Sequence, residues 1–151
     1  MLRKINAPTF AYLTVYGKYP NPPISGREAQ HTTKNINGIE WDIHIPDKAI
    51  EILTKKDTNC IETRASCEGD SPRHLTFLIF RPISQDISTV KKIIKFLKMN
   101  GFKYVSYNIG QQGKYRICVS DHLYYSETNK KRFIRWWIKL AVTLKHMCNV
   151  I

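Results

Sequence analysis

The sequence predicts a single α+β domain over residues 1–151, with elements in the order βαββαββα, an antiparallel or mixed sheet, helices on one face and a long C-terminal helix. Segments in which apolar and polar residues alternate, which is typical of strands, are interleaved with segments in which apolar residues recur at helical spacing. The content of 42% hydrophobic and 11% aromatic residues is that of a folded protein. A chain of 151 residues is also long enough to enclose one hydrophobic core.

The N-terminal quarter is expected to hold one strand and a long loop. β-forming residues from Thr9 to Tyr16 predict a strand that ends at Gly17, because the prolines at positions 20, 22 and 23 cannot continue a ladder. Residues 17–38 are therefore predicted to form a long surface loop that ends in the Asn37-Gly38 turn. Alternating apolar and polar residues from Ile39 to Ile45 predict the next strand.

A helix and two strands are predicted in the middle of the chain. Pro46-Asp47 opens a short helix. Strands at roughly 59–66 and 74–81 follow, joined by a turn at 67–73. The second of these strands is apolar on both sides, so we expect it in the centre of its sheet.

The second half is predicted to contain a helix, a hairpin and the longest helix. Asp86 or Ser88 caps the first helix and Asn100-Gly101 ends it. Strands at 103–109 and 114–120 form the hairpin, and the last helix begins near Thr128-Asn129.

Two topologies fit this order of elements. Residues 39–120 follow a ferredoxin-like split βαβ unit, or equally a duplicated αββ unit with copies at 46–81 and 86–120. The two descriptions predict different strand orders, and both place helices on one face of the sheet.

Positive charge is concentrated in the second half of the chain. Residues 86–151 hold 13 of the 24 Lys and Arg residues but only 3 of the 12 Asp and Glu residues. Solvated faces usually mix both signs, whereas such a one-signed field favours nucleic acid, either RNA or DNA, or an anionic nucleotide. The predicted binding face lies on the middle and last helices and consists of Lys91, Lys92, Lys95, Lys98, Lys130, Lys131, Arg132, Arg135 and Lys139. Tyrosines interleaved with these cations could stack on bases.

Other partners stay open at this point. The same basic face could meet an acidic protein surface, as in an interaction factor of a phage or mobile element. Trp136 and Trp137 lie about 100° apart on a helix, so we expect one in the core and the other at its edge or in an interface. That leaves a homodimer through the last helix as an alternative.

The sharpest local motif lies at the exit of the strand predicted at 59–66. Its pattern, Ile-x-Thr-x-x-Ser-Cys-x-Gly from Ile61 to Gly69, resembles that of a group of small uncharacterised bacterial and phage proteins. More distantly, it is similar to the Ser-Ser-Cys-Ser-Gly-Arg motif of the tRNA wybutosine-synthesis methyltransferase family. The matching residues are Ser66, Cys67 and Gly69, and the departing ones are Ala65, Glu68 and Asp70. Over residues 47–81 the resemblance implies a similar local fold.

An enzyme is the second hypothesis, either a nucleic-acid modifying or a nucleotide-processing one, with its site at the turn of residues 66–69. A reactive thiol needs a neighbouring base or cation that lowers its pKa. The candidate catalytic residues are Cys67, Glu68, His44 and His74. Because the sequence contains no Gly-rich cofactor loop, we expect no cofactor.

The four cysteines are scattered along the chain. They form no C-x-x-C pair and have no histidine at zinc-finger spacing, so we expect no metal site. The sequence shows neither a signal peptide nor an apolar run that could span a bilayer, which predicts a cytoplasmic protein. In that reducing compartment all four should be free thiols, with Cys60, Cys118 and Cys148 as small buried residues.

Overall fold

The computed structural model describes residues 33–36, 38–67, 76–110, 112–123 and 125–151, with the backbone alone at positions 33, 40 and 64–67. The strand predicted from Thr9 to Tyr16 and residues 17–32 of the predicted loop lie outside this part of the chain. The described elements are β1 (Thr33–Ile36), β2 (Ile39–Asp42), α2 (Asp47–Leu53), the 3₁₀ helix η2 (Lys56–Thr58), β3 (Ile61–Cys67), β4 (Thr76–Pro82), α3 (Ile87–Met99), β5 (Tyr104–Ile109), β6 (Tyr115–Asp121) and α4 (Lys130–Val150).

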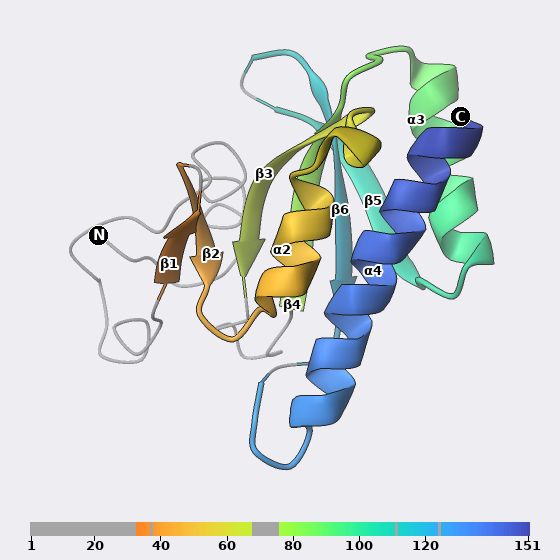
Figure 1. Ribbon diagram of the computed structural model, residues 1–151. Helices are drawn as coiled ribbons and strands as arrows, with labels where there is room; N and C mark the ends of the chain where they lie inside the picture. Colours follow the sequence, from red (N-terminus) through yellow and green to blue (C-terminus); the bar gives the residue numbers. More distant parts are fainter. Residues whose placement is uncertain (1–32, 37, 68–75, 111, 124) are drawn as a thin grey trace.

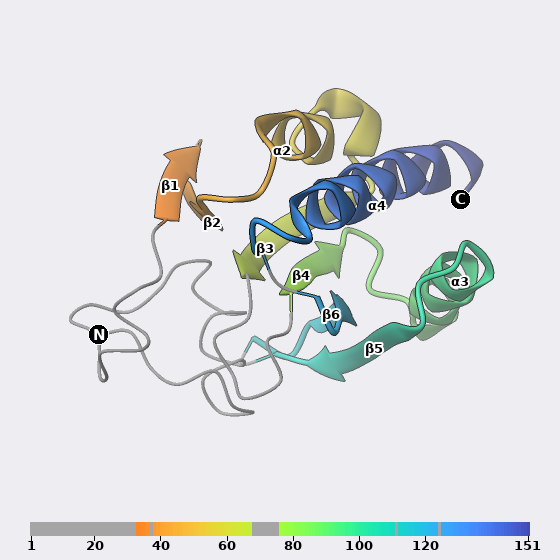
Figure 2. The ribbon, with the colours of Figure 1, turned by 90° about the horizontal axis from the view of Figure 1, so that it is seen from below.

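The main sheet has four antiparallel strands in the order β3-β4-β6-β5. Two hairpins, β3-β4 and β5-β6, meet through their second strands, which is the arrangement of a duplicated αββ unit. A ferredoxin-like sheet would include β2, which instead pairs with β1 in a separate two-stranded sheet. Helices α2, α4 and α3 all lie on one face of the main sheet (Figures 1 and 2), as the sequence predicts for this α+β class.

Strand β1 is a correction to the predicted loop. Residues Thr33–Ile36, at the end of the predicted 17–38 loop, pair antiparallel with β2. The turn between them is closed by the side chain of Asn35, whose Oδ1 accepts a hydrogen bond from the Gly38 N–H at 3.1 Å. Gly38 has a φ of 85°, which glycine adopts without strain. Gly38 therefore lies between two paired strands, and residues 33–36 belong to a hairpin, not to the predicted loop.

The core lies between the main sheet and the three helices. Residues 76–80 of β4 are all buried, which confirms its predicted central position. On the helix side, α4 contributes a stripe of buried residues at helical spacing: Phe133, Trp137, Leu140, Ala141, Leu144 and Met147. Trp137 is 0% exposed and Trp136 is half-buried, so the sequence prediction for this pair, one in the core and one at its edge, is confirmed.

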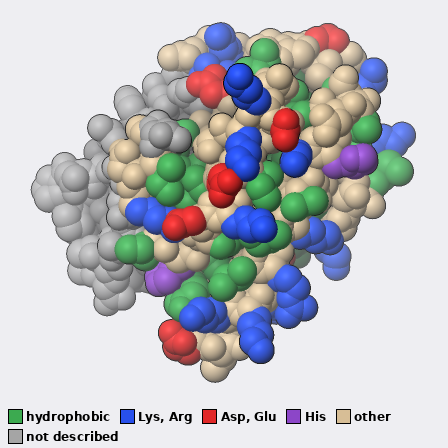
Figure 3. Space-filling view, viewed as in Figure 1, with side chains coloured by type: hydrophobic (Ala, Val, Ile, Leu, Met, Phe, Trp, Pro, Cys, Tyr) green, Lys and Arg blue, Asp and Glu red, His purple; other side chains and the backbone are tan. Residues whose placement is uncertain are grey.

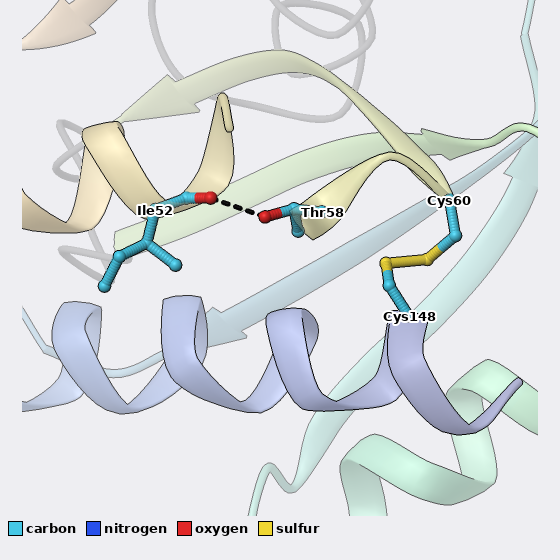
Figure 4. The surroundings of a disulfide bond; sticks show 4 residues. All are labelled: Ile52, Thr58, Cys60 and Cys148. Carbon is cyan, nitrogen blue, oxygen red and sulfur yellow. Dashed lines mark hydrogen bonds between the residues drawn. A yellow bond between two sulfur atoms is a disulfide. The ribbon is translucent and has the colours of Figure 1, made fainter. Parts of the chain in front are cut away.

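A disulfide joins Cys60, between η2 and β3, to Cys148 in the last turn of α4 (Figure 4), with their Cα atoms 5.4 Å apart. The prediction of free thiols is wrong for these two residues. The pair could not be predicted from the sequence, because 88 positions separate the cysteines and only the packing of α4 beside η2 brings them together. Close by, the Thr58 hydroxyl donates to the Ile52 carbonyl and Lys145 Nζ lies 3.5 Å from Asp57 Oδ2.

No helix in the described ranges is both long and apolar enough to cross a membrane.

Candidate functional site

The described cations gather in part around a pocket beside the N-terminal half of α4. Arg132, Trp136 and Lys139 follow one another at spacings of four and three, so they lie on one side of that helix. The pocket has a volume of about 510 Å³. Its remaining walls come from the end of α3 and start of β5, residues 101–104, and from the end of β6, residues 120–122.

The end of α3 directs the chain into the pocket wall. Gly101 has a φ of 94° and its N–H donates to the Lys98 carbonyl at 3.2 Å. The Phe102 N–H donates to the Leu97 carbonyl at 3.1 Å. These two bonds form the Schellman pattern that ends helices at a left-handed glycine. The predicted stop at Asn100-Gly101 is thus confirmed, and it sets the direction in which the chain leaves α3 towards Lys103.

Aromatic side chains line much of the pocket. The rings of Phe102 and Trp136 meet edge to face with centroids 6.1 Å apart, and the Lys139 ammonium lies 5.2 Å from the Phe102 ring centroid. Tyr104 and His122 form a second edge-to-face pair at 4.9 Å. Tyr104 is 47% exposed, so part of its ring surface is open to a ligand.

The charged groups of the pocket, all of which the structure describes, are not paired with one another at salt-bridge distance. None of its three cations, Lys103, Arg132 and Lys139, forms an ion pair within the described part of the chain. The single carboxylate, Asp121, accepts a hydrogen bond from the His122 N–H through Oδ1 at 2.7 Å and has no described cation within 4 Å. A ligand with both anionic and N–H groups would find a partner for each here.

The predicted basic residues fall into two groups. Lys91, Lys92, Lys95 and Lys98 are exposed along α3, whose buried residues point to the core. The other five are exposed on the N-terminal half of α4, where basic side chains outnumber acidic ones, whereas both signs mix over α2 (Figure 3). Of all nine, Arg132 and Lys139 line the pocket and the rest do not. Where the chain is described, none of the nine is ion-paired, in contrast to Lys145, which lies beside Asp57.

The first turn of α4 is unusual for a helix start. It holds no acidic residue and begins with Lys130, Lys131 and Arg132. The helix begins where the sequence predicts, but the Asn129 side chain makes no capping bond, since its Oδ1 accepts from the Ser126 N–H at 2.8 Å instead. Cations near a helix N-terminus oppose the macrodipole by about 0.3–1 kcal/mol each. The positive potential at this end is therefore kept at the expense of stability.

The four candidate catalytic residues are not brought together by the described structure. Glu68 and His74 lie outside it, and of Cys67 only the backbone is described, as the last residue of β3. His44 stacks on Tyr125 with ring centroids 3.9 Å apart, and its Nδ1 lies 3.1 Å from Oδ1 of the buried Asp42. A structural role at the entry to α4 accounts for these contacts. Over the described residues, no group of three His, Cys, Asp or Glu side chains could hold a metal ion.

Cys118 is the described free cysteine, and it is poorly suited to nucleophilic chemistry. Burial raises the pKa of its thiol to about 12, although Arg116 nearby lowers that pKa. At neutral pH the group is a protonated thiol, which is neither a strong nucleophile nor a metal ligand.

Several pocket residues are not predicted as site residues from the sequence: Phe102, Lys103, Asp121, His122 and Trp136. Tyr104, in contrast, is one of the tyrosines that the sequence places among the cations as candidates for base stacking. The predicted hairpin carries part of the signal, because it brings the start of the strand at 103–109 close to the end of the strand at 114–120. In the structure Tyr104 lies opposite Ser120. That register puts residue 103 near residue 121. What the hairpin could not predict is that α4 lies against this end of it.

The chain matches no family model, and the comparisons with curated proteins and with solved structures found no match. The motif resemblance at residues 47–81 therefore stays a prediction.

Proposed function

We propose that the protein binds nucleic acid in single-stranded form through the N-terminal half of α4 and the pocket beside it. The observation that carries the proposal is a set of exposed cations, free of ion pairs within the described residues, next to a concave surface lined by aromatic rings. Phosphate groups would neutralise the cations that no described carboxylate pairs with, and the rings would contact bases.

The first turn of α4 supports an anionic ligand over a merely solvated face. Its three cations and the uncapped N–H groups of the helix start act in the same direction, since both attract negative charge. A protein gains nothing in stability from this arrangement, whereas a phosphate backbone would be held by both. The lysines of α3, on a neighbouring helix, could extend the track.

The pocket favours a single strand. Stacking on aromatic side chains needs bases whose faces are open, and in a duplex those faces are covered by neighbouring base pairs. Tyr104 and Trp136 offer partly exposed rings beside Arg132 and Lys139. An acidic protein surface could also meet the cations, but nucleic-acid bases offer the flat π faces that stack on such rings.

The salt dependence of binding tests the proposal. We expect affinity for a mixed-sequence single-stranded oligonucleotide to fall steeply between 50 and 200 mM salt, as is general for phosphate contacts. The double variant Lys130→Gln/Lys131→Gln should lower the slope of log K against log salt by about 0.7 for each phosphate that is no longer neutralised. Lys48→Gln/Lys56→Gln removes the same charge from α2 and η2, where neither lysine is ion-paired to a described residue, and should leave the slope unchanged.

A flat salt dependence, or equal effects of the two double variants, would contradict the proposal. Competition with polyglutamate of matched charge tests for an acidic protein partner instead. If the site binds nucleic acid, polyglutamate, which has no bases, should displace the bound oligonucleotide far less well than a nucleic acid of the same charge does.

A further inference from the structure

We infer that the pocket between α4 and the β5-β6 hairpin selects a guanine nucleotide of the bound strand. The inference rests on the proposed function and names the base that the pocket prefers. It starts from Asp121, a carboxylate that lies among three cations without contacting any of them within 4 Å.

The pocket carries two cations on α4 and, on the β5-β6 side, both Lys103 and the carboxylate of Asp121. Arg132 and Lys139 come from α4, while Asp121 comes from the end of β6 and is held in place by the His122 N–H at 2.7 Å. A purely anionic ligand would meet the cations but would be repelled by the carboxylate. A ligand that carries both a phosphate and N–H donors would satisfy both kinds of group.

The chemistry of the bases narrows the choice. An ionised carboxylate only accepts hydrogen bonds, through two oxygens side by side. Guanine presents two adjacent donors, N1–H and N2–H₂, on its Watson–Crick edge. Adenine and cytosine each place a ring nitrogen acceptor beside the amino group, and uracil flanks its single N–H with two carbonyls. Guanine is therefore the base whose edge matches Asp121 at both oxygens.

The rings of the pocket suit a base in this position. Tyr104 and His122, the latter adjacent to Asp121, form an edge-to-face pair, and Tyr104 is half-exposed. Trp136, on the α4 wall of the pocket, lies between Arg132 and Lys139 along the helix. A base between these walls would direct its phosphate to the cations of α4. The volume of about 510 Å³ leaves room for one nucleotide.

The test compares the 5′-monophosphates of guanosine, adenosine, cytidine and uridine with inorganic phosphate, each titrated against the full chain. We expect guanosine monophosphate to bind on the order of tenfold more tightly than the other three, and phosphate more weakly than any nucleotide. In Asp121→Asn the amide can still accept from the His122 N–H, so the local fold is kept. This variant should bind the guanine nucleotide more weakly, while adenine nucleotide and phosphate bind equally or more tightly because a negative charge is gone.

Glu127→Gln is the matched control, since it removes an exposed carboxylate from the loop before α4 that does not line the pocket. It should keep the guanine preference. Equal affinities for the four nucleotides, or an Asp121→Asn variant that shifts all four alike, would overturn the inference. Steep salt dependence with an oligonucleotide but no base preference refutes the inference alone. Guanine-selective binding of the monophosphates with a flat salt dependence of strand binding refutes the proposed function instead.

Discussion

Loss of the Cys60–Cys148 disulfide should strongly destabilise the protein. The bond closes a loop across 88 positions, and the entropy that such a loop removes from the unfolded chain corresponds to about 4.6 kcal/mol. Disulfides in proteins usually contribute about 2–4 kcal/mol. Because domains of this kind unfold with about 5–15 kcal/mol, reduction should remove a large part of the stability.

Urea unfolding followed by tryptophan fluorescence measures this effect. Trp41 and Trp137 are fully buried, so their emission reports loss of the core. With and without reductant, we expect midpoints that differ by about 1–2 M urea. The double variant Cys60→Ala/Cys148→Ala should match the reduced protein and be insensitive to reductant. Cys118→Ala, which removes a free thiol, is the control that should keep the sensitivity.

Peptide mapping tests whether the Cys60–Cys148 disulfide forms. Digestion without reductant should yield one cross-linked peptide that contains Cys60 and Cys148. Two results would refute the predicted stabilisation by loop closure. One is the absence of this peptide from protein purified under oxidising conditions, and the other is an unfolding midpoint that does not change when the cross-linked protein is reduced.

Two further predictions concern single residues. Burial raises the pKa of Cys118 from 9.0 to about 12, so alkylation of this thiol at pH 8 should be about 1,000-fold slower in folded than in urea-unfolded protein. The same shift contributes stability that is fully present below pH 9 and is lost as the pH rises from 9 towards 12. Unfolding measured across this pH range, for the protein and for Cys118→Ala, would test this contribution. Gly101→Ala should lower stability by about 1–2 kcal/mol because of the positive φ at this position, and it should weaken nucleotide binding because the added Cβ would lie 2.9 Å from Lys139 Nζ. Gly113 also has a positive φ, of 72°, but faces open space, so Gly113→Ala should lower stability without affecting binding. Equal binding by the two variants would contradict the role given to Lys139.

The sequence predicts most of this fold because the elements carry their own signals. Helix α3 has its buried residues at helical spacing and a glycine stop, and β4 is apolar on both sides, so tertiary structure only confirms what local pattern already indicates. Strand β1 escapes prediction because Thr33–Ile36 is polar except at its end and resembles a loop in composition. Its strand character comes from pairing with β2 across the Asn37-Gly38 turn, and a hairpin signal has to be followed in both directions from the turn.

The site is predicted less completely than the fold. Charge and helical spacing identify Arg132 and Lys139, because both signals lie within one helix. The hairpin pattern brings Lys103 and Asp121 to one end of β5-β6, but the packing of α4 against this end cannot be derived from that pattern. The disulfide escapes prediction for the same reason, since nothing local distinguishes Cys60 and Cys148 from buried free cysteines. Contacts between segments remote in sequence are set by packing, which single-sequence patterns do not encode.

The two halves of α4 explain how a destabilising charge cluster can persist in this protein. The buried stripe from Phe133 to Met147 packs in the core against the main sheet, and the Cys60–Cys148 disulfide links the C-terminal end of the helix to the segment just before β3. These interactions hold the helix in place, so its first turn need not contribute a cap or a favourable charge. Lys130, Lys131 and Arg132 can then sit where the macrodipole disfavours them by about 1–3 kcal/mol in total. Relief of that repulsion by a bound anion would add to the free energy of binding, which is why we propose this end of α4 as the contact for a phosphate backbone.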